Sequence, residues 1–178
     1  MCETELVWLN PLNGGYIIMP LPLWKRANSF VSCSGQSTEA GGLIIGKFRG
    51  PHIEVTDITE PFTSDIRSRF SFVRKDPEHA RHAAYRWKAS DKTETFLGEW
   101  HTHPETVPHP SSIDLKSWRK LITANQRNMF FIILGTEGHW GGLGIATKIG
   151  IRAKQALLVS GNSDQLSTDM LSINHKNL

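Results

Sequence analysis

Short apolar runs, separated by glycine, proline and charged residues, constrain the fold of this 178-residue chain more than any other feature. Each run is long enough for one strand or one helix, and none approaches the roughly eighteen apolar residues that a membrane-spanning helix requires. Strand-like and helix-like runs are mixed, without a strict alternation of strand and helix. The sequence therefore predicts an α+β fold in which helices flank a mixed sheet.

The period of the apolar residues places the elements along the chain. Helical spacing and start signals predict helices in residues 21–35, 76–91 and 111–125, the last with an apolar face that includes Ile113 and Trp118. Short apolar or alternating runs predict strands. These predicted strands are residues 5–10, 14–20, 41–48, 52–60, 69–73, 95–103, 129–135, 141–148 and 155–160.

A polar carboxyl-terminal stretch sets the predicted domain boundary. From Gly161 onward the chain is rich in Ser, Asn and Asp and poor in apolar residues, so we expect the folded part to end near Ser160 and residues 161–178 to be disordered. Residues 1–160 contain no internal repeat or linker, and their number is usual for one domain. We therefore predict a single domain over residues 1–160.

Charge and cysteine content narrow the class of protein. The formal net charge is +3 and the basic residues are scattered, without a run of five like charges, so no nucleic-acid partner is expected. Cys2 and Cys33 form neither a disulfide framework nor a CxxC pair, and the amino terminus lacks the pattern of a signal peptide. We expect a cytoplasmic protein that does not enter a membrane.

Polar residues that can bind a metal gather in one stretch, GEWHTHPETVPHPSSID, residues 98–114. His101 and His103 are two residues apart on a predicted strand, so their side chains project from the same face. A catalytic zinc site usually takes three protein ligands and keeps a fourth position for water. The loop that follows the strand can turn the chain back, which makes Asp114 the candidate for the third ligand.

The same residues also have a purely structural interpretation. Ser111 and Asp114, three apart before an apolar helix, have the form of a capping box that starts the helix. Two histidines near the end of a strand can be ordinary solvated surface. The two interpretations are compatible, because Ser111 can help to start the helix while Asp114 binds metal.

The complete pattern, His-x-His, seven residues, Ser, two residues, Asp, resembles the signature of the JAMM/MPN metallopeptidases, which remove ubiquitin and ubiquitin-like modifiers. These enzymes also carry a motif Glu-x-x-Gly-x-Leu-x-Gly well upstream. The stretch EAGGLIIG resembles this motif, with Ile44 where the family prefers leucine. The resemblance covers the chain from about Leu21 to Thr147 in order of elements, and it implies a cytidine deaminase-like mixed sheet flanked by helices.

The resemblance also implies a role for each motif residue. His101, His103 and Asp114 would bind Zn²⁺. Glu39 would act as general base and then as general acid, and Ser111 would help to hold the oxyanion. All five residues of the two motifs are present, whereas the non-catalytic MPN scaffolds typically lack one or more of them.

A narrower resemblance suggests the substrate. SRFSFVRK, GEWHTHPE and the absence of long insertions resemble the deconjugating peptidases of bacterial type II CBASS anti-phage islands. This resemblance implies a ubiquitin-like conjugated protein as substrate, such as a cGAS-like nucleotidyltransferase joined through its carboxyl terminus. Two alternatives remain: a peptidase that processes a sulfur-carrier or other peptide precursor, and a scaffold that binds partners without metal.

Four further polar residues are candidates for the site or for the solvated surface. Glu99 lies two residues before His101, on the same strand face, and is a rival base or a partner that orients an imidazole. His79 and His82 are expected on a solvated helix face, and His109 on an exposed loop. Neither cysteine has a recognisable base at a family spacing, so no thiol nucleophile is predicted.

Three tryptophans are expected to contribute to the core, because the large ring is most stable where its apolar surface is buried. They are Trp87 and Trp118 on predicted helices and Trp100 on the strand that carries the two histidines. Trp100 alternates with His101, so its ring should point to the opposite face of that strand.

Overall fold

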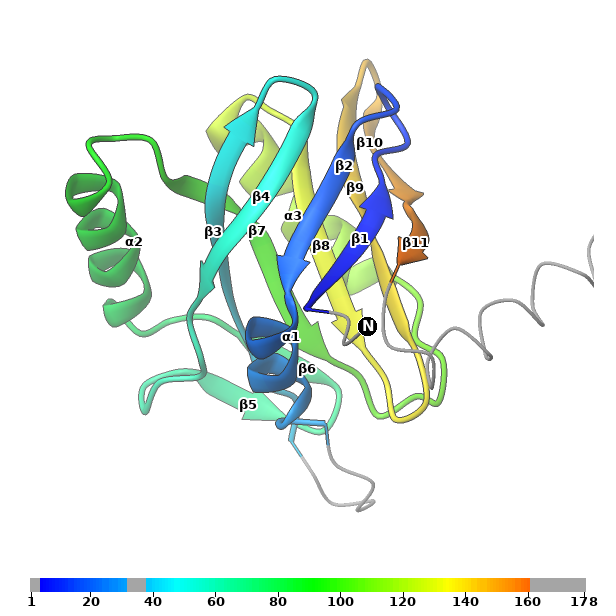
Figure 1. Ribbon diagram of the computed structural model, residues 1–178. Helices are drawn as coiled ribbons and strands as arrows, with labels where there is room; N and C mark the ends of the chain where they lie inside the picture. Colours follow the sequence, from blue (N-terminus) through cyan, green and yellow to red (C-terminus); the bar gives the residue numbers. More distant parts are fainter. Residues whose placement is uncertain (1–3, 32–37, 161–178) are drawn as a thin grey trace, which may run out of the picture.

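The computed structural model describes residues 4–31 and 38–160. Within them the chain forms a nine-stranded sheet, in the order β10-β9-β8-β7-β3-β4-β2-β1-β11, a separate β5–β6 hairpin and three helices (Figure 1). The helices are α1 (Leu21–Asn28), α2 (Glu78–Ala89) and α3 (Ser112–Asn125). The strands are β1 (Glu5–Leu9), β2 (Tyr16–Pro20), β3 (Gly41–Arg49), β4 (His52–Ile58), β5 (Ile66–Ser68), β6 (Ser71–Val73), β7 (Thr95–Thr102), β8 (Met129–Leu134), β9 (His139–Thr147), β10 (Gly150–Gln155) and β11 (Leu157–Ser160). The predicted α+β class is confirmed.

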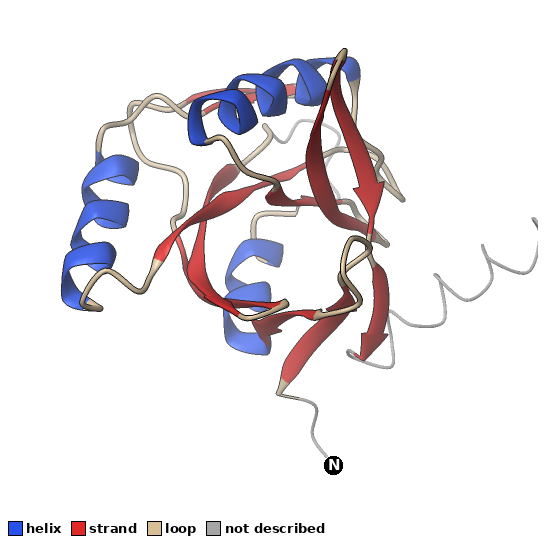
Figure 2. Cartoon of the chain, turned by 90° about the horizontal axis from the view of Figure 1, so that it is seen from above, coloured by secondary structure: helices blue, strands red, loops and turns tan. Residues whose placement is uncertain are grey.

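The main sheet is mixed and it curls. Among the described strands, β2 pairs parallel with β4 and β7 pairs parallel with β8, while the other pairs are antiparallel. The curled sheet has α1 on its inner side and α2 and α3 on its outer side (Figure 2). Helices on both sides are what the predicted architecture requires.

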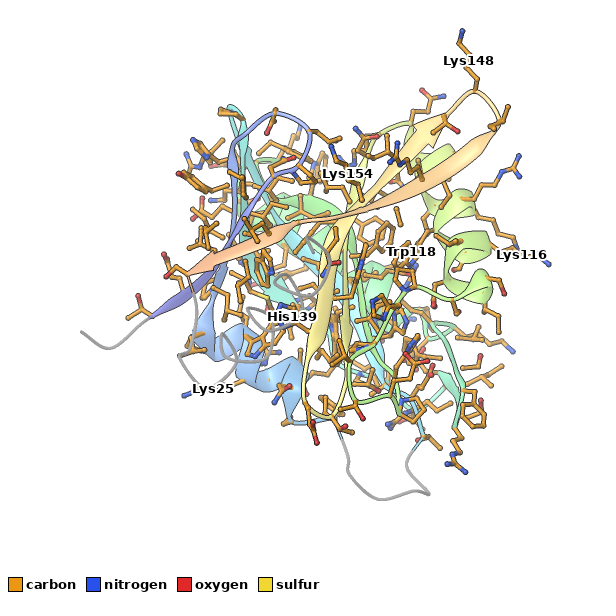
Figure 3. The ribbon with its side chains drawn as sticks, turned by 90° about the vertical axis from the view of Figure 1, so that its right-hand side faces the viewer. Lys25, Lys116, Trp118, His139, Lys148 and Lys154 are labelled. Carbon is orange, nitrogen blue, oxygen red and sulfur yellow. The ribbon has the colours of Figure 1, made fainter. Side chains whose placement is uncertain are left out.

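β8 separates two apolar cores. Its even-numbered residues belong to an inner core that includes Trp8 of β1 and Trp24 of α1, and its odd-numbered residues belong to an outer core beneath Trp118 of α3 (Figure 3). Trp118 stacks on Phe131 with ring centroids 4.1 Å apart. A strand buried on both faces needs apolar residues at every position, which accounts for the unbroken run MFFIIL.

The α2 helix is attached mainly by polar contacts, and here the prediction for His79 is wrong. His79 is fully buried, with Nδ1 2.6 Å from Thr59 Oγ1 and Nε2 2.8 Å from Asp65 Oδ2, and His82 Nε2 lies 2.8 Å from Asp57 Oδ2. His79 is therefore not on a solvated helix face, whereas the His82 side chain is 36% exposed and only partly buried. The helical pattern did not reveal these carboxylate partners, because they come from β4 and the loop after it.

Predictions for the large apolar residues had mixed outcomes. Trp100 and Trp118 are buried as expected, and Trp100 Nε1 donates to the Thr59 carbonyl at 2.9 Å. Trp87 is 45% exposed and lies against Lys92, and Ile113 is 62% exposed, so both were wrongly assigned to apolar faces. In α2 polar pairs replace an apolar stripe, and in α3 the packed face begins only at Leu115 and Trp118.

Several predicted boundaries also change. The first helix ends at Asn28 rather than Gly35, and the strand predicted at residues 69–73 is a short hairpin, with Arg69 and Phe70 in its turn. β10 was not predicted, because its charged residues interrupt the apolar pattern. The predictions for Cys2, Cys33 and residues 161–178 fall outside the described residues. None of the three helices is long and apolar enough to cross a bilayer.

Candidate metal centre

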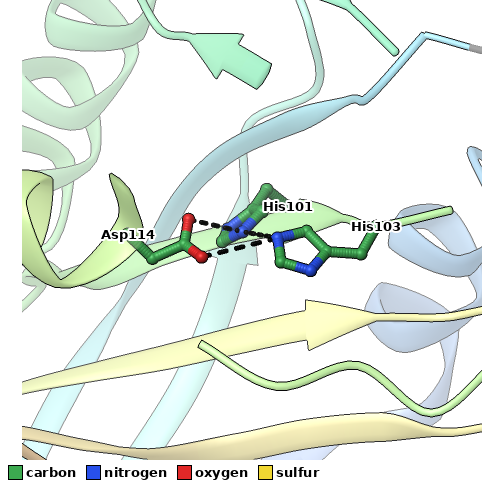
Figure 4. Close-up of side chains that lie close together, drawn as sticks. All are labelled: His101, His103 and Asp114. Carbon is green, nitrogen blue, oxygen red and sulfur yellow. Dashed lines mark hydrogen bonds and ion pairs between the residues drawn. The ribbon is translucent and has the colours of Figure 1, made fainter. Parts of the chain in front are cut away.

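The end of β7 and the beginning of α3 bring the predicted metal ligands together (Figure 4). His101 is the penultimate residue of β7, and the His103 N–H donates to the Leu134 carbonyl at 2.8 Å, which continues the pairing of β7 with β8. The two imidazole rings lie on one side of the strand with centroids 4.8 Å apart. Asp114, in the first turn of α3, faces both of them.

The donor atoms of these three residues converge on one point. His101 Nε2 lies 3.0 Å from His103 Nε2 and 3.1 Å from Asp114 Oδ1, and His103 Nε2 lies 3.5 Å from Asp114 Oδ2. Two imidazole nitrogens and a carboxylate this close require a proton or a cation between them. Bonds of about 2.0–2.1 Å to a tetrahedral zinc ion place ligand atoms about 3.3–3.4 Å apart. The residues therefore fit a three-ligand zinc site.

Asp114 is both a helix cap and a candidate ligand. Its N–H donates to Ser111 Oγ at 3.2 Å, and its Oδ2 accepts from the N–H and the hydroxyl of Ser111, each at 2.6 Å. Its other oxygen, Oδ1, faces His101. Burial raises the pKa of this carboxyl, but hydrogen bonds from His101, His103 and Ser111 outweigh burial and lower the pKa far below its ordinary value. Both interpretations of the Ser-x-x-Asp pattern fit the geometry.

Glu39 lies two residues before β3 and lines the same cleft as the three candidate ligands. Its side chain is buried, with only 6% of the residue exposed. Burial raises the pKa of the Glu39 carboxyl to about 7, although the neighbouring His103 lowers it. A carboxyl of this kind can take up and release a proton near neutral pH.

Glu99, the rival base, also lines the cleft, on the His101 face of β7 as expected. Its Oε1 accepts from Arg74 Nε at 2.8 Å, and its side chain is 18% exposed. The Glu99 carboxylate is thus already engaged by an ion pair with Arg74, outside the group of candidate ligands. Glu39 is therefore better suited than Glu99 to move a proton in this cleft.

The loop between the two motif halves is held against the turn that joins β8 to β9. The Thr136 N–H donates to the Glu105 carbonyl at 2.9 Å, and the Glu137 N–H donates to the Thr106 carbonyl at 3.0 Å. His109 is exposed, as predicted. The carboxylate of Glu105 lies 3.6 Å from His103 Nδ1, which is the ring nitrogen that does not face Asp114. Sequence reasoning missed Glu105, although an acidic residue two positions after His103 was a signal for it.

The walls of the cleft were also missed. The β5–β6 hairpin contributes one wall and the first two turns of α3 the other. The wall residues are Phe70, Ser71 and Phe72 on the hairpin and Ile113, Ser117 and Trp118 on the helix. The hairpin residues lie in SRFSFVRK, which was noted only for its resemblance, and the assembled structure is what places both walls at the cleft.

The chain is similar to several known proteins. Residues 32–143 match the family model of prokaryotic homologs of the JAB domain. The chain is 39% identical, over 149 residues, to a protein of Escherichia coli (strain TW11681) named CD-NTase/cGAS isopeptidase, covering 84% of this chain and 94% of that protein. A protein of the same name from Vibrio cholerae serotype O1 is 35% identical over 142 residues, covering 80% and 90% of the two chains.

A more distant relative and one solved structure extend the comparison. A protein of Sinorhizobium fredii named probable metalloprotease is 25% identical over 108 residues, 57% of this chain and 66% of that one. The solution structure of a protein from Desulfitobacterium hafniense has a TM-score of 0.52 and 18% identity, covering 75% of this chain and 86% of that chain. The second likeness concerns the fold alone.

Proposed function

Because the chain belongs to the prokaryotic family of JAB-domain proteins, we propose that it is a zinc-dependent isopeptidase. The observation that carries the proposal is the convergence of His101, His103 and Asp114 with Glu39 in one cleft. Two imidazoles and one carboxylate are a usual ligand set for a catalytic zinc ion, and a nearby glutamate is the usual proton carrier.

We propose that the substrate is a protein joined through its carboxyl terminus to an amine, in the manner of a ubiquitin-like conjugate. Relatives named CD-NTase/cGAS isopeptidase support a cGAS-like nucleotidyltransferase as that protein. In this proposal the enzyme acts in the bacterial cytoplasm, where it releases the nucleotidyltransferase from its conjugates during anti-phage defence of the CBASS type.

Glu39 carries the proton in the proposed reaction. When bound, a zinc ion would supply a Lewis acid, which lowers the pKa of a water molecule to about 7 and polarises a carbonyl group. Glu39 takes up the proton of the attacking water on its carboxylate and returns it to the nitrogen of the departing amine. In the protein without metal, burial raises the pKa of the Glu39 carboxyl to about 7, so this carboxyl can exist in both protonation states.

Ser111 donates a hydrogen bond to the carbonyl oxygen as negative charge develops on it. Its hydroxyl donates to Asp114 Oδ2 at 2.6 Å in the structure, so it has to exchange one acceptor for another when substrate is bound. Asp114 keeps the hydrogen bond from the Ser111 N–H during this exchange. The helix cap therefore holds Ser111 beside the ligands while its hydroxyl turns to the substrate.

The proposal is tested by measuring zinc content and cleavage of an isopeptide-linked conjugate in the same preparations. We expect near-stoichiometric zinc in the wild type, loss of both zinc and cleavage in His103→Ala, and loss of cleavage with zinc retained in Glu39→Gln. His109→Ala is the matched control, because this exposed histidine lies in the loop between the same motif residues. Freshly purified wild type without zinc, and without activity after zinc is added, would contradict the proposal.

A second candidate keeps the chemistry and changes the substrate to a sulfur-carrier precursor or another linear peptide. The relative named probable metalloprotease favours it. A linear peptide fusion assayed beside the isopeptide-linked conjugate separates the two substrates by their kcat/KM values. A scaffold that binds partners without metal is disfavoured, because all five motif residues are present.

A further inference from the structure

The backbone of Glu39 is held by the β5–β6 hairpin. β3 begins at Gly41, so Glu39 precedes the strand that pairs with β7. The Glu39 N–H donates to the Ser68 carbonyl at 2.7 Å, and the Glu39 carbonyl accepts from Arg67 Nε at 2.8 Å. Both backbone groups of the proposed base are therefore bonded to two adjacent hairpin residues.

The residue after Glu39 is fixed by the strand that carries the histidines. The Ala40 N–H donates to Thr102 Oγ1 at 2.9 Å, and the Thr102 N–H donates to the Ala40 carbonyl at 2.8 Å. Because Thr102 lies between His101 and His103, it aligns Ala40 with the candidate ligands. The peptide group between Glu39 and Ala40 is therefore held at both ends, its N–H by Thr102 and its carbonyl by Arg67.

The hairpin itself is firmly anchored, which a support for the base requires. Asp65, just before β5, accepts from the buried His79 Nε2 at 2.8 Å and also from three backbone N–H groups. His79 in turn bonds Thr59 at the end of β4. The Phe72 ring packs on Gly41 so closely that a Cβ there would lie 2.5 Å from it. The hairpin lies beside the carboxyl end of β7 (Figure 1).

From these contacts we propose that Arg67 is a positioning residue of the reaction. It acts by fixing the peptide group of Glu39 so that the carboxylate faces the metal cleft, and it does not contact the substrate. Arginine suits this task, because its planar group bonds two acceptors at once: Nη2 also lies 3.4 Å from the Thr38 carbonyl. The inference rests on the proposed function, since it takes Glu39 as the base.

The test compares Arg67→Ala, Arg67→Lys and Arg49→Ala with the wild type. Arg49 is the matched control. It ends β3, the strand that begins two residues after Glu39, and it lies far from the cleft. It pairs with Glu54, and its side chain is 63% exposed. We expect kcat of Arg67→Ala to fall by about 10- to 100-fold, because a catalytic group misplaced by about 1 Å loses that much. Zinc content and KM should stay within about twofold of wild type, by the same argument.

Partial rescue distinguishes positioning from folding. Arg67→Lys should recover part of kcat, because its ammonium can reach one of the two carbonyls, and ethylguanidinium added to Arg67→Ala should recover part as well. Arg49→Ala should keep wild-type kcat with or without ethylguanidinium. An unchanged kcat in Arg67→Ala overturns the inference. A loss of zinc or a rise in KM with no rescue also overturns it, since a merely structural residue would behave in that way.

Glu39→Gln, measured in parallel, separates this inference from the proposed function. If Glu39→Gln is inactive and Arg67→Ala is fully active, only the role of Arg67 is wrong. If Glu39→Gln keeps wild-type turnover, Glu39 is not the base, and both assignments fail. If both assignments are right, the variant that combines Glu39→Gln with Arg67→Ala should have the same turnover as Glu39→Gln alone, because Arg67 then has no base to position.

Discussion

At the scale of single residues, Asp114 shows how one carboxylate can serve structure and chemistry together. Its Oδ2 caps α3 through Ser111, and its Oδ1 faces His101. The helix thus starts at a fixed point relative to β7, and the position of the third candidate ligand follows from the start of the helix. Ser111 therefore affects both the stability of α3 and the geometry of the cleft.

Replacing Ser111 by alanine should separate these two effects. We expect the zinc-free protein to lose about 0.5–2 kcal/mol of unfolding free energy, because a helix cap is removed. Turnover should fall by about 10²–10³, because a donor to the oxyanion is removed. Urea unfolding and kcat measure the two losses. Ser112→Ala is the control, since Ser112 is exposed in the first turn. Lower stability with normal turnover would make Ser111 a cap only.

His139 is a buried histidine that the proposed reaction does not use. Its ring packs edge-on against both Trp8 and Trp24, and its Nε2 accepts from Trp8 Nε1 at 3.3 Å. Burial lowers the pKa of His139 from 6.5 to about 4. The folded protein therefore holds this ring neutral at a pH where the unfolded chain already binds a proton.

Stability should fall between pH 7 and pH 5 because of His139. The unfolded state binds more protons in this window, so unfolding free energy rises with pH and is lost as the pH drops below about 6.5 toward about 4. Linkage with these pKa values gives a loss of about 2 kcal/mol between pH 7 and pH 5. Urea unfolding of chelator-treated wild type and His139→Gln measures it. The two proteins should differ in pH dependence by that amount, and parallel curves would contradict the prediction.

At the scale of elements, α2 depends on a charge network that joins it to the sheet. Arg86 donates to Asp57 at 2.7 Å and to both oxygens of Glu94 at 2.7 and 2.9 Å. The hydrogen bond from Arg86 is the main reason why the pKa of Glu94 is lowered, and it outweighs burial, which raises this pKa. Both acidic side chains are nearly buried, so removal of Arg86 leaves two poorly solvated carboxylates.

Arg86→Leu should therefore destabilise the protein much more than the loss of one surface arginine. We expect a loss of about 2–4 kcal/mol, somewhat below the value for a fully buried pair because the Arg86 side chain is 27% exposed. Arg81→Leu on the exposed side of the same helix should change stability by less than about 0.5 kcal/mol. Thermal unfolding of both variants is the measurement. Equal effects would mean that the network contributes little.

The elements that sequence could predict are those with a local signal. β8 was recognisable because it is apolar at every position, and α3 because its cap and its apolar period agree. β10 was missed, since its partner strand rather than its own residues makes it a strand. The burial of His79 and the exposure of Trp87 were missed for a related reason: a polar network, not an apolar stripe, decides which face of α2 is inward.

The same distinction applies to the candidate site. The proposed ligands lie within one strand, loop and helix, so their spacing alone predicted that they could converge. The contact between Arg67 and Glu39 joins residues 28 positions apart, on segments that meet only through the packing of the hairpin. Spacing carries no information about such a contact, because the length and course of the connecting chain decide it.

At the scale of the whole molecule, the last strands close the sheet. β10 pairs with β9 at one end of the sheet and β11 pairs with β1 at the other, and only Ala156 lies between them. The Ala156 N–H donates to the Gly141 carbonyl at 2.9 Å where the chain crosses (Figure 3). This connection protects the hydrogen-bonding groups of β1, which would otherwise form an open edge.

The position of the carboxyl-terminal boundary can be tested by shortening the chain. A chain ended at residue 160 keeps β11, so it should melt within about 2 °C of the full chain, because less than about 0.5 kcal/mol is then lost. A chain ended at residue 155 loses the pairing of β11 with β1 and the packing of Leu158 on the inner core. The loss should be about 3–5 kcal/mol, from one apolar side chain and a few backbone hydrogen bonds.

Both shortened chains lack residues 161–178, so their difference reports on β11 and Ala156 alone. The melting temperature of the chain ended at residue 155 should be far below that of the other two chains. Its zinc content should fall as its folded fraction falls. β8, which runs beside the histidine strand, packs in the same inner core as β1, so opening the sheet at β1 weakens the support of the metal site. A chain ended at residue 160 that unfolds would place the boundary of the domain beyond Ser160.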